Sequence, residues 1–108
     1  MRRREVIISP DALRDIEDIA GYISGRDGGS RAEYVVDRIE AVIDSLALTP
    51  ARGSYVPELL DFGSGKFRQT LFKPYRIIYR VEDKTVRVYL IADGRRNMPA
   101  LLSRRLLG

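Results

Sequence analysis

The sequence predicts an α+β fold in which an antiparallel two-helix hairpin packs on one face of an antiparallel β-sheet. Two stretches within residues 10–48 repeat apolar side chains at the spacing of an amphipathic helix. Three runs rich in β-branched and aromatic residues follow after residue 65, as expected for strands. With 108 residues, 44% of them hydrophobic, the chain fits one domain over residues 1–108. The predicted order is β-α-α-β-β-β, with a tail that is compatible with a C-terminal helix.

The first two predicted elements are a short strand over residues 5–9 and a helix that begins directly after it. Ser9 suits the N-cap because its hydroxyl can accept a bond from a free backbone N–H, and Pro10 suits the first helical position. The run "GRDGG" at residues 25–29 is expected to end this helix. The apolar side chains that recur at helical spacing are Leu13, Ile16, Ile19, Ala20 and Ile23.

A second helix is predicted to begin at "SRAE", where Ser30 and Glu33 match the capping-box pattern. It is predicted to end near Leu48, because a proline follows Thr49 and disfavours the helical conformation there. The turn between the two helices is short and rich in glycine, so the helices should form an antiparallel hairpin. The apolar stripe of the second helix consists of Ala32, Val35, Val36, Ile39, Val42, Ile43 and Leu46.

The segment 50–65 carries two prolines and three glycines, which predicts a loop with a short helical turn at Glu58–Asp61. The three predicted strands after it are "KFRQTLF" at 66–72, "YRIIYRV" at 75–81 and "TVRVYLIAD" at 85–93. In the tail, Asn97 is placed to cap a C-terminal helix that would bury several leucines.

Arginines interrupt the second and third of these strands, and the alternation of side chains decides which face they occupy. With Asp83 and Lys84 as the turn, Arg80 lies opposite Arg87, and Ile77, Tyr79 and Leu90 point toward the helices. Like charges directly opposite each other are destabilising, so the other face is predicted to be a basic, partly apolar interaction site for an acidic partner. The residues of this predicted site are Arg76, Ile78, Arg80, Arg87, Tyr89 and Ile91. The alternative is that Glu82, Asp93 or acids from the loops neutralise the arginines internally.

The charge of the chain is divided unevenly between its two halves. Residues 1–65 hold 8 Lys/Arg and 12 Asp/Glu, a net charge of −4, whereas residues 66–108 hold 11 Lys/Arg and 3 Asp/Glu, a net charge of +8. This asymmetry favours an anionic partner for the second half, such as nucleic acid, an acidic protein segment or the ribosome. A basic surface that only keeps the protein in solution is the alternative.

Two residue types are missing, and their absence excludes several kinds of chemistry. There is no cysteine, hence no disulfide and no thiolate metal site, and no histidine, the commonest acid–base and metal-binding side chain near neutral pH. The sequence therefore predicts no metal site, no cofactor and no Ser-His-Asp or Cys-His arrangement. The N-terminus lacks the long apolar stretch of a secretion signal and no run is long enough to span a membrane, so a cytoplasmic protein is expected.

Four stretches together resemble the ParE branch of the ParE/RelE superfamily, the toxins of type II toxin–antitoxin systems. They are "SPDALRDIEDIAGYI" at 9–23, "AEYVVDRIEAVIDSLALTP" at 32–50 followed by Arg52-Gly53, "KFRQTLFKPYRIIYRV" at 66–81 and "IADGRRNMPALL" at 91–102. The resemblance implies a helical hairpin on an antiparallel sheet. It also implies a cognate antitoxin, usually encoded next to the toxin, that binds the toxin and neutralises it, and one of two targets. ParE-like members poison DNA gyrase, and RelE-like members cut messenger RNA on the ribosome. We expect an acidic, amphipathic segment of this antitoxin to bind the predicted site formed by Arg76, Ile78, Arg80, Arg87, Tyr89 and Ile91.

The residues that RelE-like nucleases use help to choose between these targets. Arg76 matches the sheet arginine of that pattern, and Arg95 or Arg96 matches the arginine after the last strand. The tail, however, has no tyrosine or histidine to transfer a proton, and Glu58 and Asp93 are the remaining candidates, neither within a motif. We therefore predict a gyrase-directed toxin without catalytic residues of its own, and keep the nuclease and an inactive, antitoxin-binding module as alternatives. It should not bind nucleic acid sequence-specifically by itself, and the predicted target-binding residues are Arg95, Arg96, Arg104 and Arg105.

Overall fold

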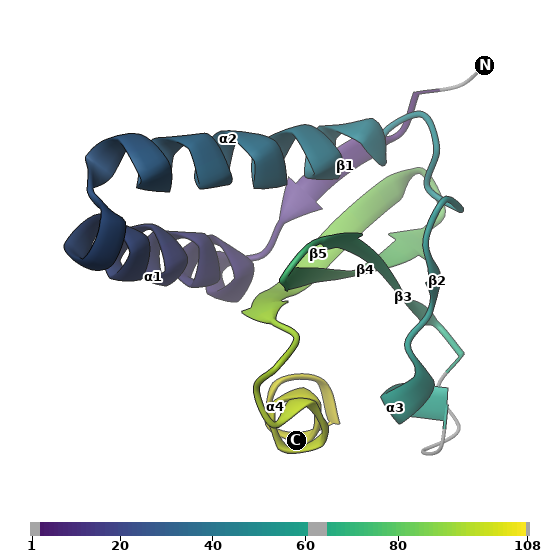
Figure 1. Cartoon of the computed structure of the whole chain (residues 1–108). Helices are drawn as coiled ribbons and strands as arrows, with labels where there is room; N and C mark the ends of the chain where they lie inside the picture. The colour runs from purple at the N-terminus through teal and green to yellow at the C-terminus, as the bar shows by residue number, and fades with distance from the viewer. Residues whose placement is uncertain (1–2, 61–64, 108) are drawn as a thin grey trace.

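The computed structural model describes residues 3–60 and 65–107. Five strands form one sheet in the order β1-β5-β4-β3-β2, with a helical hairpin on one face and shorter helices on the other (Figure 1). The strands are β1 (Glu5–Ile8), β2 (Ser54–Tyr55), β3 (Phe67–Phe72), β4 (Tyr75–Glu82) and β5 (Thr85–Asp93). The helices are α1 (Pro10–Asp27), α2 (Gly29–Ser45), α3 (Pro57–Leu60), α4 (Met98–Leu102) and the π-helix η1 (Ser103–Leu107).

The predicted α+β architecture is confirmed, with one correction to the sheet. The strand β1 runs parallel to β5, with Val6 opposite Val86, so the sheet is mixed rather than antiparallel throughout. The two strands can run parallel because the helical hairpin and the strands β2, β3 and β4 lie between them in the chain. A parallel pair requires a long connection of this kind. The two-residue strand β2, which was expected to be loop, pairs with β3.

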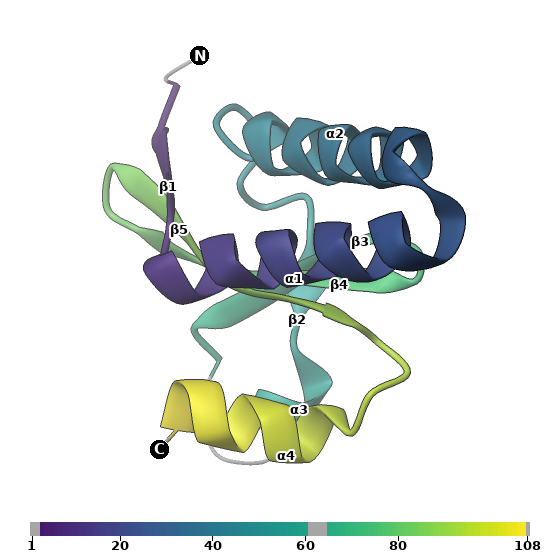
Figure 2. The same ribbon diagram turned by 90° about the vertical axis from the view of Figure 1, so that its left-hand side faces the viewer.

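The helical hairpin forms as predicted, but its turn uses a glycine in place of the expected capping box. The Ser9 hydroxyl caps α1 by accepting a bond from the Ala12 backbone N–H at 3.1 Å. Gly28 joins the helices with φ of 95°, a conformation that glycine adopts most easily, and no side chain caps α2. The predicted Ser30–Glu33 capping box is therefore wrong, because α2 already begins at Gly29. Figure 2 shows both helices lying on the same side of the sheet.

The sheet is buried on both faces, so the protein has two hydrophobic cores. The upper core, between the sheet and the helical hairpin, includes Ile39 and Ile43 of α2 and Ile77 and Tyr79 of β4. The lower core, between the sheet and α3 and α4, includes Leu59, Phe67, Ile78, Leu90, Leu101 and Leu102. The sequence predicted the helical hairpin that covers the upper core, but it predicted the helices that cover the lower core only in part.

A β-bulge in the β4–β5 hairpin alters the predicted register. The turn at Asp83 and Lys84 and the pair Arg80–Arg87 are confirmed. Beyond the pair Tyr79–Val88 the register shifts by one residue, so Ile78 pairs with Leu90 and Ile77 pairs with Ile91. A shift of one residue turns each following side chain to the other face, so Ile91 lies in the upper core and Leu90 in the lower core. The predicted positions of these two side chains were exchanged.

The C-terminal segment packs against the lower face of the sheet. Asn97 caps α4 as predicted, with its side-chain oxygen accepting a bond from the Ala100 backbone N–H at 3.2 Å. Met98, Leu101 and Leu102 are buried against the sheet. Within the described parts of the chain, no helix combines the length and apolar character needed to cross a membrane.

Candidate functional site

Arg76 lies on the lower face of the sheet, and each of its three guanidinium nitrogens donates a hydrogen bond within the protein. Its two terminal nitrogens donate to the two carboxylate oxygens of Glu58 at 2.7 and 2.8 Å, and its Nε donates to the Gln69 side-chain oxygen at 2.6 Å. The two side chains of the pair are 13% and 26% exposed. The hydrogen bonds from Arg76 lower the pKa of Glu58, which therefore stays charged. Arg76 thus links β4 to α3.

Arg80 and Arg87 face each other across β4 and β5, as predicted, but Glu82 lies close to both. Its carboxylate oxygens are 3.6 Å from Arg80 Nε and 3.5 Å from Arg87 Nε, and one of them accepts the Tyr89 hydroxyl at 2.7 Å. The Tyr89 hydrogen bond, followed by the arginines, lowers the pKa of Glu82. The expected repulsion is therefore offset internally, which is the alternative that the sequence left open.

Two of the predicted antitoxin-binding residues are not on the surface. Ile78 is fully buried beneath α4, and Ile91 is 1% exposed beneath the helical hairpin. The expectation that both form an exposed apolar patch is wrong, because the sheet is covered on its second face and the bulge turns Ile91 to the first. Arg80, Arg87 and Tyr89 stay partly exposed.

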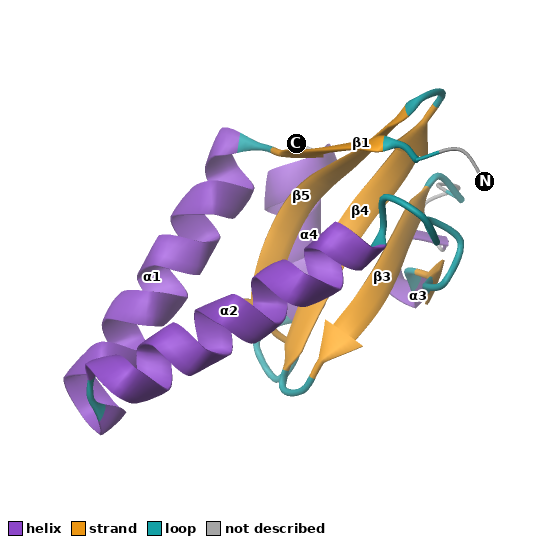
Figure 3. Ribbon diagram, turned by 90° about the horizontal axis from the view of Figure 1, so that it is seen from above, coloured by secondary structure: helices purple, strands orange, loops and turns teal. Residues whose placement is uncertain are grey.

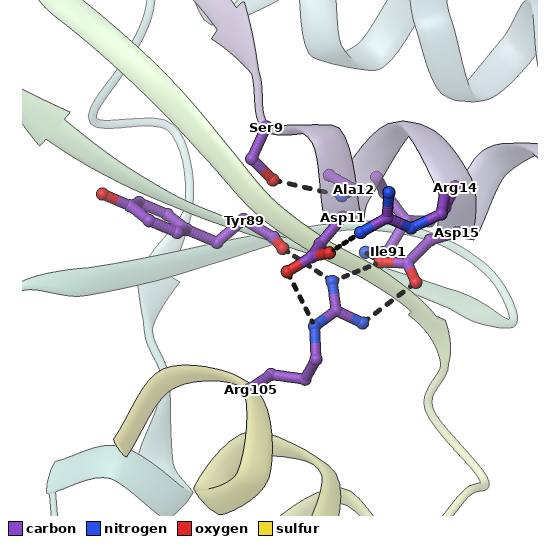
Figure 4. Close-up of polar contacts among 8 residues, drawn as sticks. All are labelled: Ser9, Asp11, Ala12, Arg14, Asp15, Tyr89, Ile91 and Arg105. Carbon is purple, nitrogen blue, oxygen red and sulfur yellow. Dashed lines mark hydrogen bonds and ion pairs between the residues drawn. The ribbon is translucent and has the colours of Figure 1, made fainter. Parts of the chain in front are cut away.

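Arg105 joins the C-terminal π-helix to α1 instead of projecting into solvent (Figure 4). Its two terminal nitrogens donate to the two Asp15 carboxylate oxygens at 3.0 Å each, and one also donates to the Tyr89 backbone oxygen at 3.1 Å. The same Asp15 carboxylate accepts the Ile91 backbone N–H at 3.0 Å. The strand β1 pairs with β5 only as far as Val88. Beyond that residue, Asp15 and Arg105 provide hydrogen-bond partners for the backbone groups at the edge of β5.

The other three predicted target-binding arginines are exposed but differ in their contacts. Arg95 is held by Asp93 through two side-chain hydrogen bonds of 2.9 and 2.6 Å. Arg96, in the loop after β5, and Arg104, in the π-helix, form no ion pair with the residues that the structure describes. Only Arg95 and Arg96 of the four predicted residues come together at one site.

That site is an open cleft of about 470 Å³ between the helical hairpin and the ends of the central strands. Its apolar lining consists of Ile19, Ile23, Val35, Phe72, Ile91 and Ala92. Two tyrosines also line it, Tyr22 of α1 and Tyr75 of β4. Its charged lining consists of five cations, Arg26, Arg31, Lys73, Arg95 and Arg96, and four acids, Asp15, Asp18, Asp27 and Asp93. Burial, followed by the neighbouring Asp93 charge, raises the pKa of Tyr75, so this hydroxyl stays protonated near neutral pH.

The sequence did not indicate this cleft, because its residues come from four separate segments. The only local signal is the spacing of Tyr22 and Arg26, which places the Arg26 guanidinium over the Tyr22 ring at 5.5 Å. Nothing in a single sequence shows that Lys73 and Arg96, from two different loops, lie near this pair. Among the described residues, no group of three carboxylates could hold a metal ion.

Three solved structures have the same fold at low sequence identity. The chromosomal ParDE toxin–antitoxin system from P. aeruginosa matches at 17% identity with a TM-score of 0.71, over 84% of this chain and 96% of that chain. The RelBE2 toxin–antitoxin complex from Mycobacterium tuberculosis matches at 21% identity and a TM-score of 0.60, over 86% and 93%. A mutant of the E. coli toxin RelE in the free state matches at 11% identity and a TM-score of 0.62, over 96% and 99%.

The sequence itself matches one protein family across most of its length. No curated protein matches the chain at a significant level. The profile of the family described as "ParE toxin of type II toxin-antitoxin system, parDE" matches residues 6–98, which include the helical hairpin and all five strands apart from the first residue of β1. The chain therefore belongs to the ParE toxin family of type II toxin–antitoxin systems.

Proposed function

We propose that this toxin inhibits DNA gyrase by binding to it, and that a cognate antitoxin neutralises the toxin. The observation that carries this proposal is the state of Arg76, the sheet arginine that a RelE-like nuclease would use on its RNA substrate. Both of its terminal nitrogens are occupied by Glu58, and its side chain is 13% exposed. To bind a phosphate, this guanidinium would have to give up its bidentate pair with Glu58, so the arrangement favours a mode of action that needs no catalytic arginine.

The neighbouring groups also argue against cleavage of RNA through its 2′-hydroxyl. That reaction needs a proton acceptor with a pKa near the working pH. The chain has no histidine, and the pKa of Glu58 is lowered, which makes its carboxylate a weak base. The Tyr89 hydroxyl donates to Glu82, and α4 covers the sheet beside Arg76. Proton transfer at Arg76 would therefore require its ion pair with Glu58 to be broken.

An antitoxin partner follows from membership of the family, and two of the similar structures are described as toxin–antitoxin systems or complexes. We propose that the partner is an acidic, amphipathic protein segment, since the second half of the chain carries a net charge of +8. Because gyrase acts on chromosomal and plasmid DNA, the proposed place of action is the bacterial cytoplasm.

The target is tested by two assays run in parallel on the same purified protein. One contains gyrase and supercoiled plasmid, and the other contains ribosomes translating a defined message. Linear plasmid released by detergent, together with an intact message, supports the proposal. A message cut in the presence of ribosomes, with gyrase unaffected, would replace it by the RelE-like nuclease. Inactivity in both assays would leave a module that only binds antitoxin.

A further inference from the structure

We propose that the outer edge of the sheet, beside β2 and β3, binds the phosphate backbone of duplex DNA without reading its sequence. This surface, the edge patch, consists of Arg52, Tyr55, Lys66 and Arg68. The proposal goes beyond the proposed function, which assigns no contact between the toxin and DNA.

Three segments of the chain bring the edge patch together. Seen from above, α2 crosses the sheet toward β3, and the loop after it passes the outer edge of that strand (Figure 3). Arg52 lies in this loop, and Tyr55 of β2 pairs with Arg68 of β3. Lys66 is exposed directly before β3. Since β2 is the outermost strand of the described sheet, these side chains lie at its open edge.

The two arginines are held in place by neutral groups rather than by carboxylates. Arg68 donates to the Gly53 backbone oxygen at 2.8 Å, and its guanidinium carbon lies 4.5 Å from the centre of the Tyr55 ring. Arg52 donates to the Ser45 hydroxyl at 2.7 Å. These contacts fix the positions of both guanidiniums but do not neutralise their charge.

The loop that carries Arg52 is fixed to the sheet, which keeps the two cations near each other. The Tyr79 hydroxyl binds backbone groups of Pro50 and Gly53, on either side of Arg52. Burial raises the pKa of Tyr79, and the charges of Arg68 and Arg52 oppose this rise because a nearby cation stabilises the phenolate. Both guanidiniums therefore lie near the same hydroxyl. An anionic ligand would relieve the repulsion between them.

Most other arginines after Lys66 are already paired with acids of the protein. Those that form ion pairs are Arg76, Arg80, Arg87, Arg95 and Arg105. Within residues 3–60 and 65–107, the three cations of the edge patch form no ion pair. Their charge is therefore available to a partner.

The composition of the edge patch favours a phosphate backbone over an acidic protein segment. A duplex presents a regular line of phosphates, which arginine, lysine and tyrosine side chains bind without contacting the bases. Tyr55 is 48% exposed, so its hydroxyl can donate to a phosphate oxygen. A protein interface usually has an apolar centre, and the edge patch offers only one ring. The cleft beside the helical hairpin differs, because its four acids would repel a line of phosphates.

The helical hairpin supplies a matched control for the edge patch. Arg31 lies over the exposed Tyr34 ring at 5.3 Å, much as Arg68 lies over Tyr55, and Arg38 is exposed on the same helix. Neither Arg31 nor Arg38 forms an ion pair with a described residue. Replacing these two arginines therefore makes the same change in net charge at a different place.

The probe is a fluorescein-labelled DNA duplex, and its binding to the purified toxin is followed by anisotropy over a series of salt concentrations. We expect Arg52→Gln/Arg68→Gln to weaken binding by about tenfold or more at low salt, and equally on a second duplex of unrelated sequence. The plot of log affinity against log salt should become shallower by about 2, roughly 1 for each phosphate contact. Arg31→Gln/Arg38→Gln should change the affinity by less than about twofold.

Two further measurements separate the edge patch from a general effect of charge or folding. Tyr55→Ala should weaken binding and leave the salt dependence unchanged, because it removes a hydrogen-bond donor but no charge, whereas Tyr34→Ala should have no effect. In the wild type, bound duplex should protect Arg52 and Arg68 from an arginine-selective reagent, as read by mass spectrometry of the peptides. This second measurement involves no substitution, so it does not depend on the folding of a variant.

Several results would overturn the proposal. One is a wild type that does not bind the duplex at low salt. Another is an equal loss in the edge-patch and hairpin variants, because binding would then reflect net charge alone. If the wild type does not bind the duplex but the edge-patch variant loses affinity for the protein encoded beside the toxin gene, the patch is a protein interface instead. The assay contains no gyrase, so its failure and the failure of the proposed function are distinguishable.

Discussion

Tyr79 is the largest fully buried side chain, and its hydroxyl holds the loop between α2 and β2 against the sheet. It donates to the Pro50 backbone oxygen at 2.6 Å and accepts the Gly53 backbone N–H at 3.2 Å. Gly53 is needed at this position, because a Cβ there would lie 2.7 Å from the hydroxyl and would overlap the Gln69 carbonyl oxygen. This contact gives a physical reason for the glycine of the Arg52-Gly53 pair in the family resemblance.

We predict that Tyr79→Phe lowers the free energy of unfolding by about 1–3 kcal/mol, because it leaves a partly buried carbonyl and a partly buried N–H without the Tyr79 hydroxyl as a partner. Urea denaturation measures the change. Tyr34→Phe, at an exposed ring, is the control and should lie within about 0.5 kcal/mol of the wild type. Equal stability of the two variants would contradict the role assigned to the Tyr79 hydroxyl.

The Glu58–Arg76 pair should make stability depend on pH in a defined direction. Since the pKa of Glu58 is lowered in the folded state, the contribution of the pair is complete above the ordinary carboxyl pKa of 4.5 and is lost as the pH falls through the folded value. We expect Glu58→Gln to lower the free energy of unfolding by about 1–3 kcal/mol at pH 7, the scale of a charged hydrogen-bonded group. The difference from the wild type should shrink as the pH falls through the range below 4.5. A difference that stays constant over this range would exclude the ion pair as its cause.

Among the elements, the C-terminal π-helix depends on one side chain for its attachment to α1. Arg105 is 19% exposed and binds Asp15 and the Tyr89 backbone oxygen, whereas Arg104 is exposed and forms no ion pair with a described residue. We predict that Arg105→Ala costs about 1–3 kcal/mol and that Arg104→Ala costs less than about 0.5 kcal/mol. In hydrogen exchange, the amides of η1 and the Ile91 amide should lose protection in the first variant only. Similar exchange in both variants would show that the apolar contacts of α4 hold the segment alone.

The elements that the sequence predicts well are those specified by residues close together in the chain. The apolar spacing of α1 and α2, the Ser9 cap and the Asp83–Lys84 turn are local features, and each is found where it is predicted. The bulge at Tyr89 depends on tertiary packing instead. It turns Leu90 toward the lower core and Ile91 toward the upper core. A strict alternation rule has no means of locating such a shift.

For the whole molecule, the sequence predicts that the second half of the chain is basic. It does not predict which of the cations form ion pairs within the protein. Its basic second half is a property of composition, whereas the pairing of Arg76 with Glu58 and of Arg105 with Asp15 joins residues distant in the chain. Two of the residues that were predicted to bind partners, Arg76 and Arg105, are therefore already paired within the protein. Among the described residues, Lys73 and Arg96, from two loops, have no ion-pair partner at a cleft that only the folded chain forms.

We propose that the toxin acts on gyrase by occupying it, without turnover. The most direct measurement titrates the toxin into a fixed amount of purified gyrase and supercoiled plasmid, stops the reaction with detergent and protease, and quantifies linear plasmid. We expect linear plasmid to rise with toxin and to reach a plateau once the gyrase is occupied, and we expect prior mixing with the neighbouring gene's protein to abolish it. Unchanged gyrase activity at toxin concentrations well above that of the enzyme would contradict the claim.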